Sequence, residues 1–462
     1  MGESEVRLWC DEGWRVMRRR TARRRSARMW RGSSSVRARA AGLAALLLCA
    51  TAALSAGPAL AAGTPGPYAF APDARPVSGG ASTADAGALK PGATYRSSLP
   101  GAGETHYRID LDDTSDAYVS VTAVPAAGST IHAGDGIKVS VRDAQGRSCS
   151  QDTETFGVVR SPRPIAAWGM REISADRPHC ETAGAYDVIV ERVTTAESVP
   201  DTWDLELFAA TEPPLKQAGE TSAPETWDSA SPDPLTGDGE RRKGGAGFAS
   251  AVPVGEGAWT SDIQPGRTLF YKVPLDWGRQ LHATAELGAV DGGDGYAVGA
   301  LNLALYNPVR GFVDDAGANY DGSEKAAELD PLPPVAYENR YAGPDRLGAM
   351  RFAGSYYLVV HLSAEVAERY GDGPFELTLR VQESGAAQAG PGYAGESEPG
   401  DVFQLSAGDR EAAAEDEAGN GAGGIENAAL TVLAVSGIGA GTLVLVVLGV
   451  WAVVARRRVG AL

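Results

Sequence analysis

The sequence has little of the residue types that most often carry chemistry: its 462 residues include five histidines and four cysteines. No two histidines have metal-ligand spacing, and neither H-E-x-x-H nor G-x-S-x-G occurs. No phosphate-binding glycine loop is found. We therefore expect no enzyme. The alternative is a cryptic hydrolase, because dispersed carboxylates can form a catalytic pair that a sequence does not reveal.

Basic residues are scarce outside the two ends of the chain. Residues 1–39 carry a net charge of +8 and the last seven residues +3, against −17 for the whole chain, which leaves the middle at −28. Nucleic acids and anionic lipids require basic faces to neutralise their phosphates. The composition therefore excludes the body as a general nucleic-acid binder.

The Arg-rich start reads as part of a secretory signal. It precedes a short apolar run, 40–56, and an A-x-A site ending at Ala61, which together predict a signal peptide over 1–61. The true start can be Met1, Met17 or Met29, since each leaves a basic segment before the apolar run.

The other end contains the one long hydrophobic run. Residues 428–455 carry no charge, which is enough for a membrane-spanning helix, since about 20 apolar residues cross the hydrocarbon layer. Three arginines in the tail 456–462 are expected to stay in the cytoplasm, giving a type I topology with the body outside the cell. Gly437 and Gly441 offer a close-packing face for another helix.

Cysteine usage predicts one disulfide. Removal of the signal leaves only Cys149 and Cys180, and two cysteines in an exported chain favour a disulfide. Metal binding by this pair would have only His179 as a nearby histidine.

The body repeats itself. Six blocks recur in the same order, which predicts an internal duplication. Within a block, apolar and polar residues alternate with period two, as in Ile137-Lys138-Val139-Ser140-Val141, the pattern of a half-buried antiparallel strand. We expect an all-β body of two tandem antiparallel β-sandwiches with jelly-roll-like connections, over 85–210 and 247–382.

The connecting segments differ in composition from the repeats. Residues 62–84 predict a flexible leader, and 211–246, rich in Pro, Ser and acids, a linker. The Gly-, Ala- and acid-rich segment 383–427 predicts an extended stalk. Val402-Phe403-Gln404-Leu405 is an apolar island in it, a candidate docking strand.

The repeated blocks resemble the bacterial pre-peptidase C-terminal domain. The similarity lies in a T-x-Y-K/R strand, a hydrophobic strand ending in D-x-x-G, an A-G-x-Y strand and a closing E-L-x-L strand, and it covers both copies. The layout is also similar to that of single-pass surface proteins of actinobacteria. The resemblance implies a secreted, non-catalytic accessory module, although the chain carries no recognisable enzyme domain.

The strongest chemical candidate is calcium. The second copy has two acidic, glycine-containing loops whose oxygens could coordinate this ion, although no EF-hand loop is complete. The alternative is that they are solvated loops on an acidic protein. The candidate ligands are Asp291, Asp294, Asp314, Asp315, Asn319 and Asp321.

Aromatic residues of the second copy form a candidate binding loop for a glycan or a protein, or else they cover the sandwich. They are Trp277, Tyr320, Tyr337 and Tyr341. The sequence thus predicts a non-catalytic cell-surface protein that binds or scaffolds an extracellular partner. The alternative is a calcium-dependent module that binds glycan or matrix.

Overall fold

The computed structural model describes residues 68–414, except 160, 175–176, 234, 236 and 238. The predicted signal peptide, the membrane span 428–455 with Gly437 and Gly441, and the tail 456–462 lie outside the described residues. Among those described, no helix has the length and apolarity to cross a membrane.

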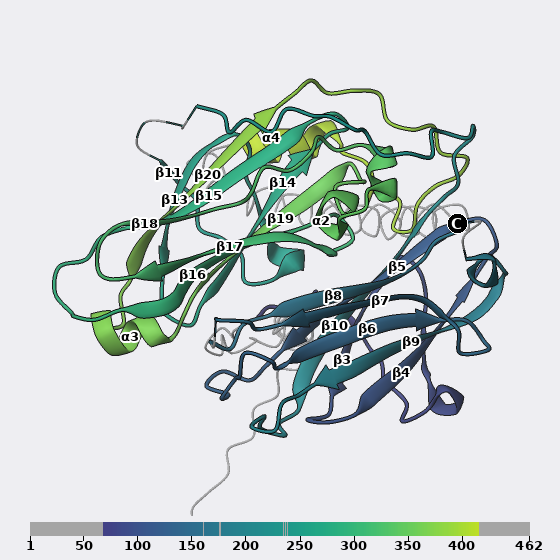
Figure 1. Ribbon diagram of the computed structural model, residues 1–462, viewed down its shortest axis with the longest axis horizontal. Helices are drawn as coiled ribbons and strands as arrows, with labels where there is room; N and C mark the ends of the chain where they lie inside the picture. Colours follow the sequence, from purple (N-terminus) through teal and green to yellow (C-terminus); the bar gives the residue numbers. More distant parts are fainter. Residues whose placement is uncertain are drawn as a thin grey trace, which may run out of the picture. The chain divides into compact units, whose positions relative to one another are not determined.

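The first sandwich consists of two five-stranded sheets (Figure 1). We call them the β5 sheet and the β6 sheet. The β5 sheet has the order β1 (Arg75–Pro76), β3 (Ala93–Leu99), β10 (Trp203–Glu212), β5 (Asp116–Val124) and β8 (Ile165–Arg171). The β6 sheet has the order β2 (Gly87–Leu89), β4 (Glu104–Leu111), β9 (Gly184–Val193), β6 (Gly136–Arg142) and β7 (Ser148–Thr155).

The second sandwich repeats this arrangement strand for strand. Its β15 sheet has the order β11 (Glu240–Arg241), β13 (Gly257–Ile263), β20 (Phe375–Ser384), β15 (Gln280–Leu287) and β18 (Lys325–Glu328). Its β16 sheet has the order β12 (Val252–Pro253), β14 (Thr268–Leu275), β19 (Gly354–Leu362), β16 (Ala297–Tyr306) and β17 (Phe312–Tyr320). The identical order of all ten strands confirms the predicted tandem β-sandwiches.

Alternation of side chains builds each core. In β6, Ile137, Val139 and Val141 are buried, and Lys138 between them lies on the outer face. Because successive side chains of a strand point to opposite faces, one side of every sheet fills the core. Large buried rings such as Trp203 in the first sandwich and Tyr356 in the second complete it.

Short helical elements lie in the connections between strands. In the first sandwich they are η1 (Thr83–Asp85) and η2 (Pro178–Cys180). In the second they are η3 (Phe248–Ser250), η4 (Tyr337–Tyr341), α2 (Asp345–Gly348) and α3 (Glu365–Tyr370), and α4 (Ala407–Ala414) follows the last strand. Of these, η4 and α2 lie in the long connection between β18 and β19.

The described parts of the leader, the linker and the stalk are packed rather than extended, which differs from the sequence-based expectation. In the leader, β1 pairs with β3. The linker and the stalk pair with each other, since the backbone N–H of Thr211 donates to Glu398 O (2.8 Å) and that of Glu398 to Thr211 O (3.2 Å). Backbone groups can pair whatever the side chains are, so composition alone misjudged these segments.

The predicted docking island does dock, although not as a strand. Phe403 is 2% exposed and its ring stacks on Phe352, with centroids 4.8 Å apart. Further on, α4 lies against the second sandwich, where the N–H of Gly255 donates to Ala413 O (2.9 Å). The described end of the predicted stalk is therefore docked on the second sandwich.

Candidate functional site

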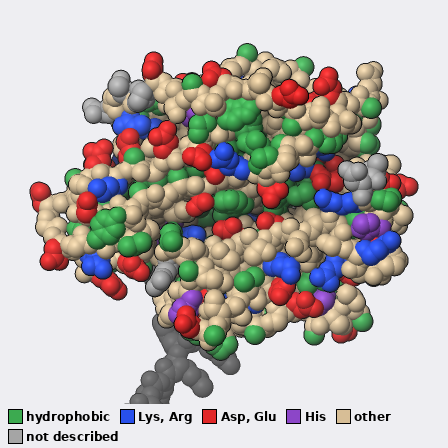
Figure 2. Space-filling view, in the orientation of Figure 1, with side chains coloured by type: hydrophobic (Ala, Val, Ile, Leu, Met, Phe, Trp, Pro, Cys, Tyr) green, Lys and Arg blue, Asp and Glu red, His purple; other side chains and the backbone are tan. Residues whose placement is uncertain are grey.

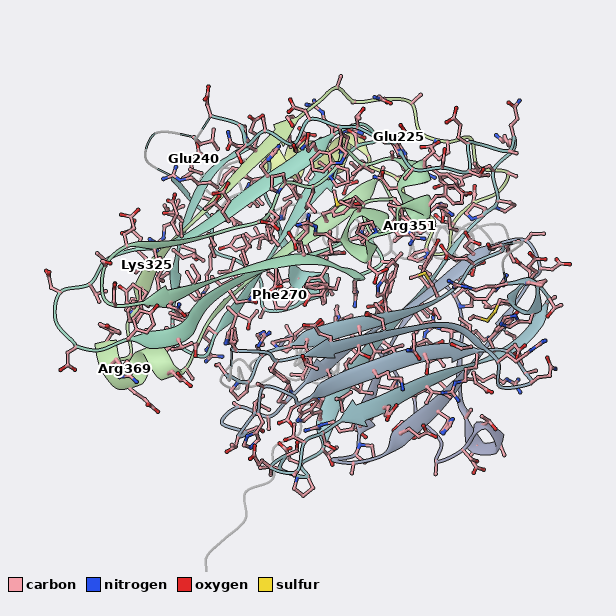
Figure 3. All side chains as sticks on the ribbon, viewed as in Figure 1. Glu225, Glu240, Phe270, Lys325, Arg351 and Arg369 are labelled. Atoms are coloured by element: carbon pink, nitrogen blue, oxygen red, sulfur yellow. A yellow bond between two sulfur atoms is a disulfide. The ribbon has the colours of Figure 1, made fainter. Side chains whose placement is uncertain are left out.

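The two sandwiches meet through non-equivalent sheets. The outer face of the β5 sheet packs on the outer face of the β16 sheet, a contact that we call the junction. Its apolar part joins Val124 and Ala166 of the first sandwich to Phe270, Tyr306 and Val359 of the second. Figure 3 labels Phe270 in the second sandwich. Since these residues form one buried cluster, the two sandwiches are packed directly against each other.

The ion pairs that cross the junction are divided by sign. Among the described residues, the first sandwich contributes the carboxylates of these pairs and the second contributes the guanidinium groups. The pairs are Glu206 with Arg310 (2.6 Å), Asp116 and Glu212 with Arg340 (3.0 and 2.9 Å), and Glu172 with Arg351. Such complementarity fixes which faces meet and in what register.

The long β18–β19 connection of the second sandwich supplies two of these arginines. Arg340 lies in η4 and Arg351 follows α2. The ring of Tyr337 covers the Arg340 guanidinium at 3.5 Å. This long connection is therefore used at least in part to hold the first sandwich.

Asp116, which is half-buried, and Glu212, which is buried, form a carboxylate pair. The hydroxyls of Tyr118 and Tyr393 donate to Glu212 (2.8 and 2.7 Å), so this carboxylate is fully partnered. Burial, and then the charge of Glu212, raise the pKa of Asp116 to about 7. A hydrolase would need such a pair in a cleft. Here the Arg340 guanidinium is paired with both carboxylates.

The four predicted binding-loop aromatics differ in their exposure to solvent. Tyr320 is fully buried and its hydroxyl donates to Gly288 O (2.7 Å), so it covers the core instead of offering a binding face. Trp277 and Tyr337 are partly buried. Tyr341 is 45% exposed. The one other exposed aromatic residue among those described is Tyr296, which is 52% exposed in the β15–β16 loop.

Four of the predicted calcium ligands have partners within the protein. Asp314 lies 3.6 Å from Arg346, and Asp315 accepts from the Asn302 amide (2.9 Å). Asn319 accepts from the N–H of Gly299 (2.8 Å). Hydrogen bonds from Ser323, then Lys325, keep the pKa of Asp321 below its usual range.

Asp291 and Asp294 lie on the exposed β15–β16 loop without a described partner. Figure 2 shows acidic side chains spread over the visible face instead of concentrated in one patch. The structure therefore does not bring the six candidates together, and calcium binding stays a prediction.

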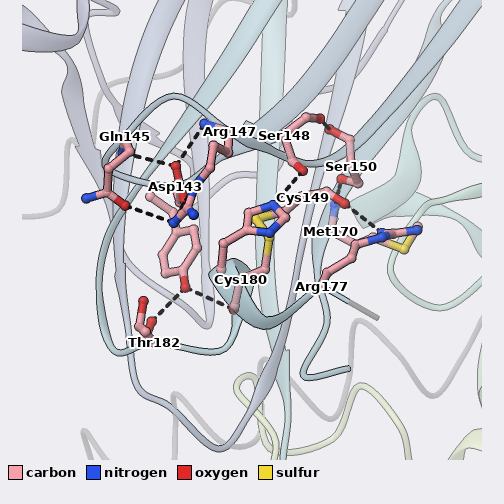
Figure 4. Close-up of a disulfide and its surroundings, with 12 residues drawn as sticks. Asp143, Gln145, Arg147, Ser148, Cys149, Ser150, Met170, Arg177, Cys180 and Thr182 are labelled. Atoms are coloured by element: carbon pink, nitrogen blue, oxygen red, sulfur yellow. Dashed lines mark hydrogen bonds and ion pairs between the residues drawn. A yellow bond between two sulfur atoms is a disulfide. The ribbon is translucent and has the colours of Figure 1, made fainter. Parts of the chain in front are cut away.

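The predicted disulfide is present. Cys149 and Cys180 join the start of β7 to η2 (Figure 4). Arg177 donates to Cys149 O (2.6 Å), which helps hold the bridge. His179 lies close to both sulfurs, but the sulfurs are bonded to each other, so this group is a covalent link and not a metal site as it stands.

A cavity of about 520 Å³ opens at one end of the second sandwich. Its walls come from the ends of β11, β13, β14 and β20, from the β14–β15 turn and from α4. Glu240, labelled in Figure 3, stands at its rim. The sequence reasoning missed this cavity because α4 lies in a segment whose composition is typical of a stalk.

Comparisons with known proteins give distant matches only. No protein-family model and no curated protein matches the chain. The tandem CBM22 modules of Xyn10C from Paenibacillus barcinonensis are 12% identical, with a TM-score of 0.17, over 62% of this chain and 83% of that one.

Two further solved structures are similarly distant. Tandem CBM51 modules of a family 98 glycoside hydrolase from Streptococcus pneumoniae are 8% identical (TM-score 0.17, 63% and 83% covered). The ANXUR2 extracellular domain of Arabidopsis thaliana is 9% identical (TM-score 0.17, 64% and 85% covered). Scores this low carry no argument about function. The likeness to pre-peptidase C-terminal domains and the actinobacterial origin stay predictions.

Proposed function

We propose that this chain is a non-catalytic, single-pass cell-surface protein whose second sandwich binds an extracellular glycan or protein. The observation that carries the proposal is the distribution of exposed aromatic rings. Among the described residues, both rings that are more than a third exposed, Tyr296 and Tyr341, belong to the second sandwich. Exposed tyrosines are frequent anchors at binding surfaces because they bury a large area at little entropic cost.

The junction supports a scaffolding role. It buries one outer face of each sandwich, so the two domains are held together as a rigid body and do not move independently. A rigid body presents its loops in a fixed orientation, which lowers the ordering cost of binding. The predicted signal peptide and membrane span would place this body outside the cell.

Retention experiments test the proposal. The full chain, purified in detergent, is incubated with cell-wall polysaccharide and with detergent extracts of the same cells. We expect specific retention of one of them, reduced at least tenfold by Tyr296→Ala or by Tyr341→Ala. Val199→Ala in the first sandwich, where the side chain is 42% exposed, is the matched control and should change nothing. If the wild-type chain retains neither polymer nor partner, the proposal is wrong.

A calcium-dependent form of this binding is the second candidate. The exposed, unpartnered carboxylates of Asp291 and Asp294 favour it, because a flexible glycine loop can bring them to one ion. Calcium should then raise the melting temperature of the chain, and Asp291→Asn with Asp294→Asn should abolish the rise. An unchanged melting temperature would exclude this candidate.

A further inference from the structure

The cavity at the end of the second sandwich has an uneven charge balance. Four carboxylates line it, from Glu240, Glu256, Asp276 and Glu383, against the two guanidinium groups of Arg279 and Arg410. A cavity with excess negative charge and low-dielectric walls concentrates cations. Its volume of about 520 Å³ is in the range of small-molecule sites.

One of the ion pairs in the cavity is complete. Arg410 of α4 donates to both oxygens of Asp276, at 2.7 and 3.0 Å. This bidentate pair is the strong geometry for a guanidinium and a carboxylate. It neutralises Asp276 and fixes α4 as one wall of the cavity.

Glu383 is paired less closely, with Arg279. Its side chain is 17% exposed, and Arg279 lies 4.0 Å away while donating to Gly385 O instead (3.0 Å). Within the described residues no hydrogen bond reaches the Glu383 carboxylate. Burial raises the pKa of Glu383, the charge of Arg279 opposes this shift in part, and the charges of Glu256 and Asp276 add to it.

We propose that this cavity binds a ligand carrying a primary ammonium group, which pairs with Glu383 inside and with Glu256 at the rim. An ammonium ion offers three donors and one positive charge, so it can supply the hydrogen bonds that the Glu383 carboxylate does not receive from the described residues. The inference rests on the proposed binding function and names a ligand class for one site of the second sandwich.

The site depends on α4. Ala413 and Ala414 line the cavity, and Ala413 is 2% exposed because its backbone is held by Gly255. Residues of α4 and of the strand ends must therefore be assembled before the ligand can bind. Ligand binding should in turn stabilise the docked α4.

The test is calorimetric titration of the full chain in detergent at 150 mM salt, with cadaverine as the probe and 1,5-pentanediol as its neutral analogue. We expect one cadaverine to bind and the diol not to bind. Glu383→Gln, which keeps the shape of the side chain, should weaken binding at least tenfold. Glu225→Gln, in the exposed linker, is the matched control for binding to acidic surfaces in general.

Glu256→Gln, at the exposed rim, gives a second measurement that does not disturb the interior, and it should weaken binding about threefold. Absence of cadaverine binding, equal binding of the diol, or unchanged affinity in Glu383→Gln and Glu256→Gln would overturn the proposal. Retention of a polymer or partner is measured separately with the Tyr296 and Tyr341 variants, so failure at this cavity is distinguishable from failure of the proposed function.

Discussion

The two sandwiches share one topology but use opposite outer faces. The outer face of the β6 sheet carries His106 and Arg142, where the equivalent β16 sheet carries Phe270 and Tyr306. The register of the paired strands shows that these positions correspond. The comparison teaches that the fold alone does not determine which outer face is buried. The polarity of a few residues on that face determines it.

Charged positions follow the same rule. Lys138 pairs with Glu191 on the open face of the first sandwich (2.9 Å). The equivalent positions in the second are Asn302 and His361, both buried. Burial lowers the pKa of His361 to about 3, so it is neutral in the junction, where an unpaired charge would be costly.

The β5 and β15 sheets also differ, but here it is the sheet of the first sandwich whose outer face lies in the junction. Asp116 and Glu212, which bind Arg340, correspond to Gln280 and Ser384 in the second sandwich. No arginine needs to be held there. Gln280 instead donates to the backbone of the linker, at Asp228 O (2.8 Å). The neutral residues Gln280 and Ser384 thus lie on a sheet face that is covered by the backbone of the linker and not by another sandwich.

The largest expected effect comes from breaking the junction ion pair between Arg310 and Glu206. Arg310→Ala leaves Glu206, whose side chain is fully buried, without its cation. We expect a loss of about 3–5 kcal/mol in the free energy of unfolding, because an uncompensated buried charge remains. Urea denaturation of the ectodomain measures it, and a loss below about 1 kcal/mol would contradict the junction as described.

The disulfide distinguishes the two sandwiches next. Cys149→Ala together with Cys180→Ala removes a crosslink between residues 31 positions apart, and we expect a loss of about 3–4 kcal/mol. The second sandwich contains no cysteine, so reducing agent should lower the stability of the first sandwich alone. Hydrogen exchange resolved by peptide would reveal this, and equal loosening of both would argue against it.

A pH profile sharpens the contrast between Asp116 and Gln280. Because the pKa of Asp116 is raised to about 7 in the folded protein, mainly by burial, folding favours the protonated acid. Its contribution to stability is therefore present below pH 4 and is lost as the pH rises through 7. Asp116→Asn should flatten the stability profile between pH 5 and 8 by up to about 2 kcal/mol. An unchanged slope would show that Asp116 is not the titrating group.

The smallest expected loss of stability comes from a substitution on the open outer face of the β6 sheet. Lys138→Ala removes an exposed partner of Glu191, and we expect a loss below about 1 kcal/mol. Salt should reduce even this difference, since exposed pairs are screened. A cost comparable with that of Arg310→Ala would mean that the β6 sheet face is also covered.

Strand alternation and repetition predicted the sandwiches, because side-chain alternation is a local property of the sequence. The cysteine pair predicted the disulfide, because exported proteins form disulfides in an oxidising compartment. The packing of the two sandwiches against each other at the junction was not predicted. Its signal was present in the strands of the second copy, where Phe270 and Val359 make the outward positions apolar as well. Reading that signal requires comparing the two copies position by position.

The candidate site was predicted poorly for a related reason. Tyr320 and Tyr337 belong to the predicted binding loop of the second copy, yet the first fills the core and the second covers Arg340. The cavity escaped notice because Arg410 and Glu383 lie far apart in Gly- and acid-rich sequence. Neither the periodicity of apolar residues nor the composition indicates that such segments dock on the second sandwich.

The junction joins unlike faces, so the contact has no symmetry that would end it after two bodies. The β16 face of a further molecule is buried in its own junction, but its open β6 face, the counterpart of the β16 face, could add to a free β15 sheet and so begin a filament. The linker blocks this addition, since Arg380 and Gln382 of the β15 sheet are already hydrogen-bonded to its backbone at Leu235 and Asp233. The segment that joins the two copies thus also limits their number to two.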